Sequence, residues 1–126
     1  MSNNPKCNCG ASPAPTGIIY SCSGAADVGE IADRAARKIS RETNVKMSCL
    51  AGIGGRVSGL LANASAAPVL VAIDGCPLDC AKKTLELAGF TNVKHVRVTD
   101  HDFRKGASPA SDGAVDKIAA VAASLL

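Results

Sequence analysis

The sequence predicts a single α/β domain with a mostly parallel sheet, and two observations support this prediction. After residue 16, short apolar runs alternate with helical patterns four times along the chain, as they do when helices cover a parallel sheet. Hydrophobic residues make up 47% of the 126 positions, yet there is one Tyr, two Phe and no Trp. Small aliphatic side chains let helices pack closely on a sheet, and a chain of this length can bury one core.

The first predicted strand and helix lie between residues 17 and 42. GIIYSC, at residues 17–22, is an apolar run typical of a short buried strand. In residues 23–42 apolar side chains recur at helical spacing and mark one buried face: Val28, Ile31, Ala35 and Ile39. Ser23 or Asp27 is expected to cap the start of this helix.

The second and third predicted strands flank a glycine-rich segment. Residues 45–49 read as a short strand, and a glycine-rich turn then leads into a helix at about residues 56–66. PVLVAID, at residues 68–74, is a continuous apolar run. Such a run predicts a strand that is buried on both faces of the sheet.

A third helix is predicted at residues 77–88, and Gly89 is expected to stop it. Proline is well suited to the first helical position, where its missing N–H costs nothing. Pro77 therefore predicts that the residue before it, Cys76, caps this helix.

The remaining residues complete the predicted architecture. VKHVRVT, at residues 93–99, alternates as an edge strand does; residues 100–111 form a loop and residues 112–126 a closing helix. Parallel strands require right-handed crossovers, so the domain at residues 17–126 is predicted to be a three-layer Rossmann-like sandwich with a four-stranded sheet. Residues 1–16, rich in Pro, Asn and Ser, are predicted to be a flexible cysteine-containing tail.

Composition argues against two classes of partner. The net charge is only +3, the basic residues are dispersed, and there are almost no aromatic rings on which bases could stack, so no nucleic acid is expected. No apolar run approaches a membrane span, and the first ten residues have no apolar core, so neither a membrane nor secretion is expected. The expected compartment is the cytoplasm, where six cysteines indicate metal ligands or reactive thiols rather than disulfides.

Four of the cysteines fall at comparable places in the predicted fold. Cys22 and Cys49 end the first two strands, Cys76 follows the third, and Cys80 lies one turn into the next helix. In a parallel sheet these strand ends share one edge, and ligand sites of open α/β sheets lie in the crevice outside that edge. Four thiols that are distant in sequence are therefore expected to converge.

Several chemistries suit converging thiols. Helix N-termini favour thiolates and lower their pKa, and a cation between the thiolates would relieve their repulsion. Four cysteines form a common tetrahedral zinc set, and four thiolates also hold iron–sulfur clusters. Low-pKa thiols could instead act as a nucleophile and its resolving partner. Any one of them could simply fill space in the core as a small hydrophobe.

Other residues are candidates for accessory roles. Cys7 and Cys9 form a thiol pair in the tail that could close over the site, deliver metal or exchange disulfides, or could have no site role. Asp74 could accept backbone N–H groups or orient a ligand, but shaping the turn before Gly75 is the favoured interpretation. His101 follows the fourth strand at the same edge and could replace a cysteine as ligand or carry a proton.

The same segments resemble a known family. IDGCPLDCAKKTLELAG is similar to the central motif of DGC-domain proteins, which are named for the Asp74-Gly75-Cys76 triplet. YSCSGAADVGEIADRAARKI, KMSCLAGIGG and VTDHDFRK agree in order, so the resemblance runs from about residue 18 to residue 105. It implies a zinc site on four shared cysteines, which fall here on the four strand-end thiols, but it supplies no reaction.

The sequence therefore predicts a zinc-binding protein that serves in metal transfer, sensing or docking to a protein partner. The alternative is a redox or sulfur-transfer enzyme that uses the same thiols. Arg56 follows Cys49 by seven residues, one too many for the Cys-x5-Arg loop of cysteine phosphatases, so phosphatase chemistry is not expected.

Overall fold

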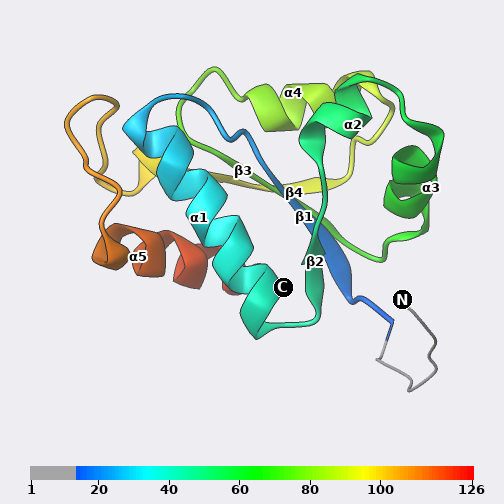
Figure 1. Ribbon diagram of the computed structural model, residues 1–126, viewed down its shortest axis with the longest axis horizontal. Coiled ribbons are helices and arrows are strands. Elements are labelled where there is room, and N and C mark those ends of the chain that lie inside the picture. Colours follow the sequence, from blue (N-terminus) through cyan, green and yellow to red (C-terminus); the bar gives the residue numbers. More distant parts are fainter. Residues whose placement is uncertain (1–13) are drawn as a thin grey trace.

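A computed structural model of the protein describes residues 14–126, and the expectations about Cys7 and Cys9 lie outside this range. The described chain is an α/β sandwich around a four-stranded sheet in the order β2-β1-β3-β4, and every neighbouring pair is parallel (Figure 1). The strands are β1 (Gly17–Ser21), β2 (Val45–Met47), β3 (Leu70–Asp74) and β4 (Val93–Arg97). The predicted fold class is confirmed.

Helices cover both faces of the sheet (Figure 1). One face packs on α1 (Asp27–Glu42) and α5 (Asp112–Ala123), and the other lies under α2 (Leu50–Gly54), α3 (Ser58–Ala66) and α4 (Cys80–Leu87). A short 3-10 helix, η1 (Val98–Asp100), follows β4. Within residues 14–126 no helix has both the length and the apolar character that a membrane crossing requires.

The two central strands are buried throughout, as the continuous apolar run of β3 predicts. Side chains alternate between the faces of a strand, so Ile19 packs toward α1 and α5 while Ile18 and Tyr20 pack toward the other layer. The β1–β3 register places Ile19 beside Val71 and Ser21 beside Ile73. The core is therefore two apolar layers that hold the strands in a fixed register.

The two edges of the sheet are β2 and β4. The prediction of β4 as an edge strand is confirmed. At the other edge, the N–H groups of Val45 and Met47 donate to the hydroxyls of Thr43 (3.1 Å) and Ser40 (2.9 Å). These hydroxyls occupy the donors that another strand would need, which protects β2 from edge-to-edge association.

The expected start of α4 was wrong. The segment after β3 forms a turn, and the helix begins at Cys80 rather than at Pro77, so Cys76 does not cap it. Asp79 interrupts any earlier start, because its backbone is left-handed (φ 54°, ψ 42°). The segment expected to be only a glycine-rich turn also contains the five-residue helix α2, where a side chain at Gly52 would collide with Leu60.

Candidate functional site

The four strand-end cysteines follow three adjacent strands of the sheet. Cys49 comes after β2, Cys22 directly after β1, Cys76 after β3, and Cys80 opens α4. All four are free thiols; Cys22 and Cys76 are partly buried, and Cys49 and Cys80 are exposed. The parallel strands thus lead all four toward the carboxyl edge of the sheet, where open α/β sheets bind ligands. Within the described residues no three of their sulfur atoms lie within 4.8 Å of one another, so the structure does not show the predicted convergence.

Cys22 contacts the backbone of the turn after β3. Its Sγ accepts the N–H of Gly75 at 3.3 Å. A side chain at Gly75 would meet the backbone of α1, whose Gly29 N would lie 2.8 Å from the added carbon, so only glycine lets the end of β3 come this close. The start of α1 and the turn after β3 therefore meet around this sulfur.

Burial raises the pKa of the Cys22 thiol. The N–H groups of Gly24 and Gly75 offset part of this effect, and the charges of Asp74 and Cys80 add to it. This direction is opposite to the expected lowering, because α1 begins at Asp27 and no helix N-terminus lies at Cys22 itself.

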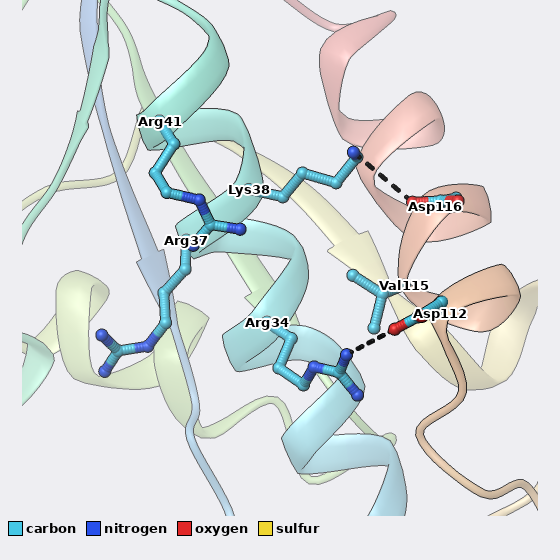
Figure 2. A pocket seen from close by; sticks show the side chains of 7 residues that line it. All are labelled: Arg34, Arg37, Lys38, Arg41, Asp112, Val115 and Asp116. Atoms are coloured by element: carbon cyan, nitrogen blue, oxygen red, sulfur yellow. Dashed lines mark hydrogen bonds and ion pairs between the residues drawn. The ribbon is translucent and has the colours of Figure 1, made fainter.

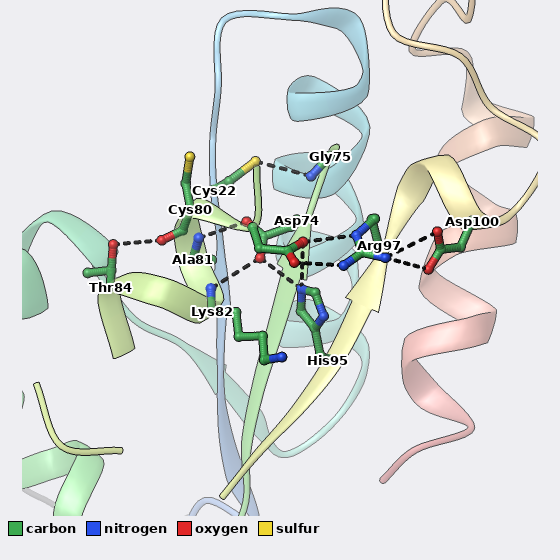
Figure 3. Close-up of polar contacts among 11 residues, drawn as sticks. Cys22, Asp74, Gly75, Cys80, Ala81, Lys82, Thr84, His95, Arg97 and Asp100 are labelled. Carbon is green, nitrogen blue, oxygen red and sulfur yellow. Dashed lines mark hydrogen bonds and ion pairs between the residues drawn. The ribbon is translucent and has the colours of Figure 1, made fainter. Parts of the chain in front are cut away.

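Cys80 lies beside Cys22 and directly follows Asp79, which Arg97 holds by two hydrogen bonds. Figure 3 shows the two thiols next to one another, and the charge of Cys80 is near enough to raise the pKa of Cys22. The carboxylate of Asp79 accepts two bonds from the Arg97 guanidinium, from Nε at 2.9 Å and from Nη2 at 2.6 Å. These bonds lower the pKa of Asp79 and raise that of Arg97.

Asp74 caps α4 from the end of β3. Its buried carboxylate accepts the N–H of Ala81 at 2.7 Å and of Lys82 at 3.1 Å, and it also meets His95 Nε2 at 2.8 Å (Figure 3). The possibility that it binds backbone N–H groups is therefore the correct one, ahead of the favoured turn-shaping role. The sequence did not reveal its partner, because α4 starts later than expected.

Asp74, Asp79 and His95 also form a group of potential metal ligands. One ligand atom from each of these residues lies within 4.8 Å of the other two. Within residues 14–126 no other set of three or more potential ligand atoms is this close. Both carboxylates are already engaged, Asp74 by backbone N–H groups and Asp79 by Arg97. The β3–β4 register, which pairs Ala72 with His95, is the signal that could have identified this neighbour of Asp74.

The loop between η1 and α5 approaches Cys76. Lys105 Nζ lies 3.8 Å from Cys76 Sγ. Asp27 holds this loop by accepting the N–H of Gly106 at 2.9 Å and of Ser108 at 3.0 Å, and these bonds lower its pKa. Asp27 bonds the N–H of Val28 as well, while the N-cap position of α1 is Ala26, so the expected cap is mainly a loop anchor.

The structure also places one predicted cap residue, Ser23, and one predicted accessory residue, His101. Ser23 is left-handed (φ 49°) and donates to Asp33 at 2.9 Å instead of capping α1. His101 directly follows η1 and belongs to no cluster of three potential ligands in the described part of the chain.

A charged hollow of about 340 Å³ lies elsewhere, between α1 and α5 (Figure 2). Two of its basic residues, Arg34 and Lys38, pair with acids of α5. Arg34 pairs with Asp112 at 2.8 Å, and Lys38 lies 3.5 Å from Asp116. These pairs join the two helices, so we assign the hollow to the interface between α1 and α5.

The fold and site define a small α/β protein whose parallel sheet carries cysteines at its carboxyl edge. The family model described as "DGC domain" matches residues 18–123, and the chain belongs to this family. It is similar to the "Anaerobic and virulence modulator AnvM" of Pseudomonas aeruginosa strain PAO1, with 34% identity over 91 residues, 72% of this chain and 70% of the relative. No solved structure matches significantly.

Proposed function

We propose that this protein binds a thiophilic metal ion, in the first place zinc, through Cys22, Cys49, Cys76 and Cys80, and that the bound state serves regulation. The observation that carries the proposal is the origin of all four thiols at the carboxyl ends of the adjacent strands β2, β1 and β3. Four thiolates form a common zinc set, and the cation would offset their mutual repulsion.

The donor set fits such an ion in its chemistry, and the segments around it suggest how the site would close. Neighbouring strands are about 4.8 Å apart, so thiols that follow three of them must lean inward to share one ion. Cys49 is exposed and Cys76 lies in a turn, which leaves these two free to approach. Cys22 and Cys80 are already neighbours.

A regulatory role is supported by the relative. AnvM is named as a modulator, and its match covers 72% of this chain. We infer that the present protein likewise acts through a partner rather than by turnover, with metal occupancy altering the carboxyl edge that the partner contacts.

Metal content of protein purified without oxygen tests the proposal. We expect one equivalent of zinc in the full chain, and loss of most of it in Cys49→Ser and in Cys80→Ser, because removal of one thiolate from a four-ligand site weakens binding strongly. Elemental analysis and titration with a chromogenic chelator provide the measurement.

Two controls locate the ion. His95→Gln removes one member of the Asp74–Asp79–His95 group and should leave the zinc content unchanged. A variant with Ser at Cys7 and Cys9 tests whether these two thiols hold the metal. Retention of zinc in both Cys49→Ser and Cys80→Ser would contradict the four-cysteine site.

A second candidate function is thiol–disulfide exchange, which the proximity of Cys22 and Cys80 favours. In such a reaction the two thiols would form one disulfide, releasing two protons and passing two electrons to a disulfide substrate, which becomes two thiols. Metal-free protein with one highly reactive thiol would favour this alternative.

A further inference from the structure

The residues before and after Cys80 in the chain are bound by side chains at the ends of two strands. On its C-terminal side, Asp74 at the end of β3 accepts the N–H groups of Ala81 and Lys82. On its N-terminal side, Asp79 is bound by Nε and Nη2 of Arg97, at the end of β4. The residues on both sides of this cysteine in the chain are therefore held by the ends of two strands.

The residue before Cys80 adopts a backbone conformation that needs outside support. Asp79 has φ 54° and ψ 42°, a left-handed conformation that residues other than glycine adopt at a cost. Its side chain makes no bond to the N-terminus of its own helix. The two bonds from Arg97 are what compensates this strain, and they also leave the Asp79 carboxylate well shielded.

Cys22 is fixed in a similar way. The next residue, Ser23, is also left-handed, and its hydroxyl lies 2.6 Å from that of Ser21 and donates to Asp33 of α1 at 2.9 Å. The Cys22 sulfur accepts the N–H of Gly75. Each of the two neighbouring thiols is thus adjacent to a strained residue that a polar contact holds in place.

We propose that Arg97, acting through Asp79, is a positioning residue that holds Cys80 beside Cys22, so that these two thiols form a preset half of the site for a thiophilic ion. This inference rests on the proposed function only for the identity of the ion. Within residues 14–126 the Arg97 guanidinium bonds Asp79 and Asp100 and no thiol; it sets where the Cys80 thiol lies.

A trivalent arsenical bonds two thiols at once, so the rate of its reaction tests whether Cys22 and Cys80 lie close together. Phenylarsine oxide forms two arsenic–sulfur bonds while its oxygen leaves as water with the two thiol protons. The test protein is the full chain with Ser at Cys7, Cys9, Cys49 and Cys76, in which Cys22 and Cys80 are the remaining thiols. Mass spectrometry measures capture, and the far-ultraviolet circular dichroism spectrum confirms that each variant is folded.

In this background we expect Arg97→Gln to reduce the rate of bridging about tenfold, because the effective concentration of one thiol at the other falls when Cys80 is released. Arg97→Lys should be intermediate, since a lysine keeps the charge and loses the fork. Adding Asp79→Gly to Arg97→Gln should restore much of the bridging, because glycine adopts the left-handed conformation without support.

A matched control is available in the loop that follows η1. Asp102 is also left-handed (φ 66°), and Lys117 lies 3.6 Å from its carboxylate. Lys117→Gln should leave bridging unchanged. Bridging by folded Arg97→Gln at the unmodified rate, or an equal loss in Lys117→Gln, overturns the assignment.

The outcome is separable from that of the proposed function. Efficient bridging that depends on Arg97, in a protein that binds no zinc, would retain the positioning role and refute the metal site. Zinc bound by all four thiols, together with a bridging rate that Arg97→Gln does not change, would support the metal site and refute the positioning role.

Discussion

At the scale of single residues, Asp74 shows how one buried carboxylate can join three elements. It ends β3, accepts two N–H groups at the start of α4, and meets His95 of β4. The two backbone N–H groups donate to its oxygens, and the His95 Nε2 contact adds a third polar partner. The aspartate is therefore suited to this position as an acceptor and not merely as a turn residue.

Replacement of Asp74 by asparagine should destabilise the protein. Asp74→Asn keeps one acceptor oxygen but turns an NH₂ group toward either a backbone N–H or the imidazole. We expect a loss of about 1–3 kcal/mol in the free energy of unfolding, the usual cost of an unsatisfied buried polar group. Urea denaturation measures it. Asp112→Asn, which disrupts an exposed pair with Arg34, should cost under about 1 kcal/mol, and equal effects would contradict the assignment.

Cys22 should react differently from an exposed thiol. Its raised pKa means that the protonated form prevails at neutral pH, and its sulfur is also partly buried. We therefore expect iodoacetamide to modify Cys22 more slowly than Cys49, with the rate at Cys22 still rising when the pH passes the ordinary thiol range. Peptide mass spectrometry over a pH series provides the measurement. Cys22 as the first thiol modified at neutral pH would contradict this.

At the scale of elements, the sequence predicted those strands and helices whose formation depends on a local residue pattern. The apolar runs of β1 and β3 and the helical spacing of α1 identified these elements, because one buried face or strand is encoded in consecutive residues. The start of α4 depends instead on Arg97, which is distant in sequence and holds Asp79 left-handed. Pro77 suggested an earlier start because its local preference carries no information about that partner.

The loop that carries Lys105 should be released by acid. Asp27 has a lowered pKa because the N–H groups of Gly106 and Ser108 donate to its charged form. A lowered pKa means that this contribution is complete above the ordinary aspartate pKa of about 3.9 and is lost as the pH falls through the folded value.

The same release should follow from Asp27→Asn at neutral pH. Because the amide removes the charge that the two N–H groups contact, we expect faster hydrogen exchange at Gly106 and Ser108. NMR exchange measurements test this, with Glu30→Gln on the same helix as the control. Unchanged exchange in Asp27→Asn would show that other contacts hold the loop.

At the scale of the whole molecule, parallel strand order explains how the sequence could indicate a candidate site. Cysteines at the ends of three strands had to share an edge once the sheet was parallel, and the strand order β2-β1-β3 makes those strands neighbours. The clamp around Cys80 was not predictable in this way. It depends on the β3–β4 register, which places Arg97 beside Asp74, and on the return of the chain at Asp79.

If the four thiols close on zinc, the response should be concentrated at the less restrained ligands. Cys22 and Cys80 already lie in fixed surroundings, whereas Cys49 is exposed after the edge strand and Cys76 lies in a turn. We expect zinc to raise the melting temperature, because it binds only the folded chain, and to slow hydrogen exchange most in the peptides around Cys49 and Cys76. Exchange mass spectrometry with and without a chelator measures this. Cys49→Ser should abolish both effects while His95→Gln preserves them, and protection confined to the peptides of Asp79 and His95 would move the metal to the carboxylate–histidine group.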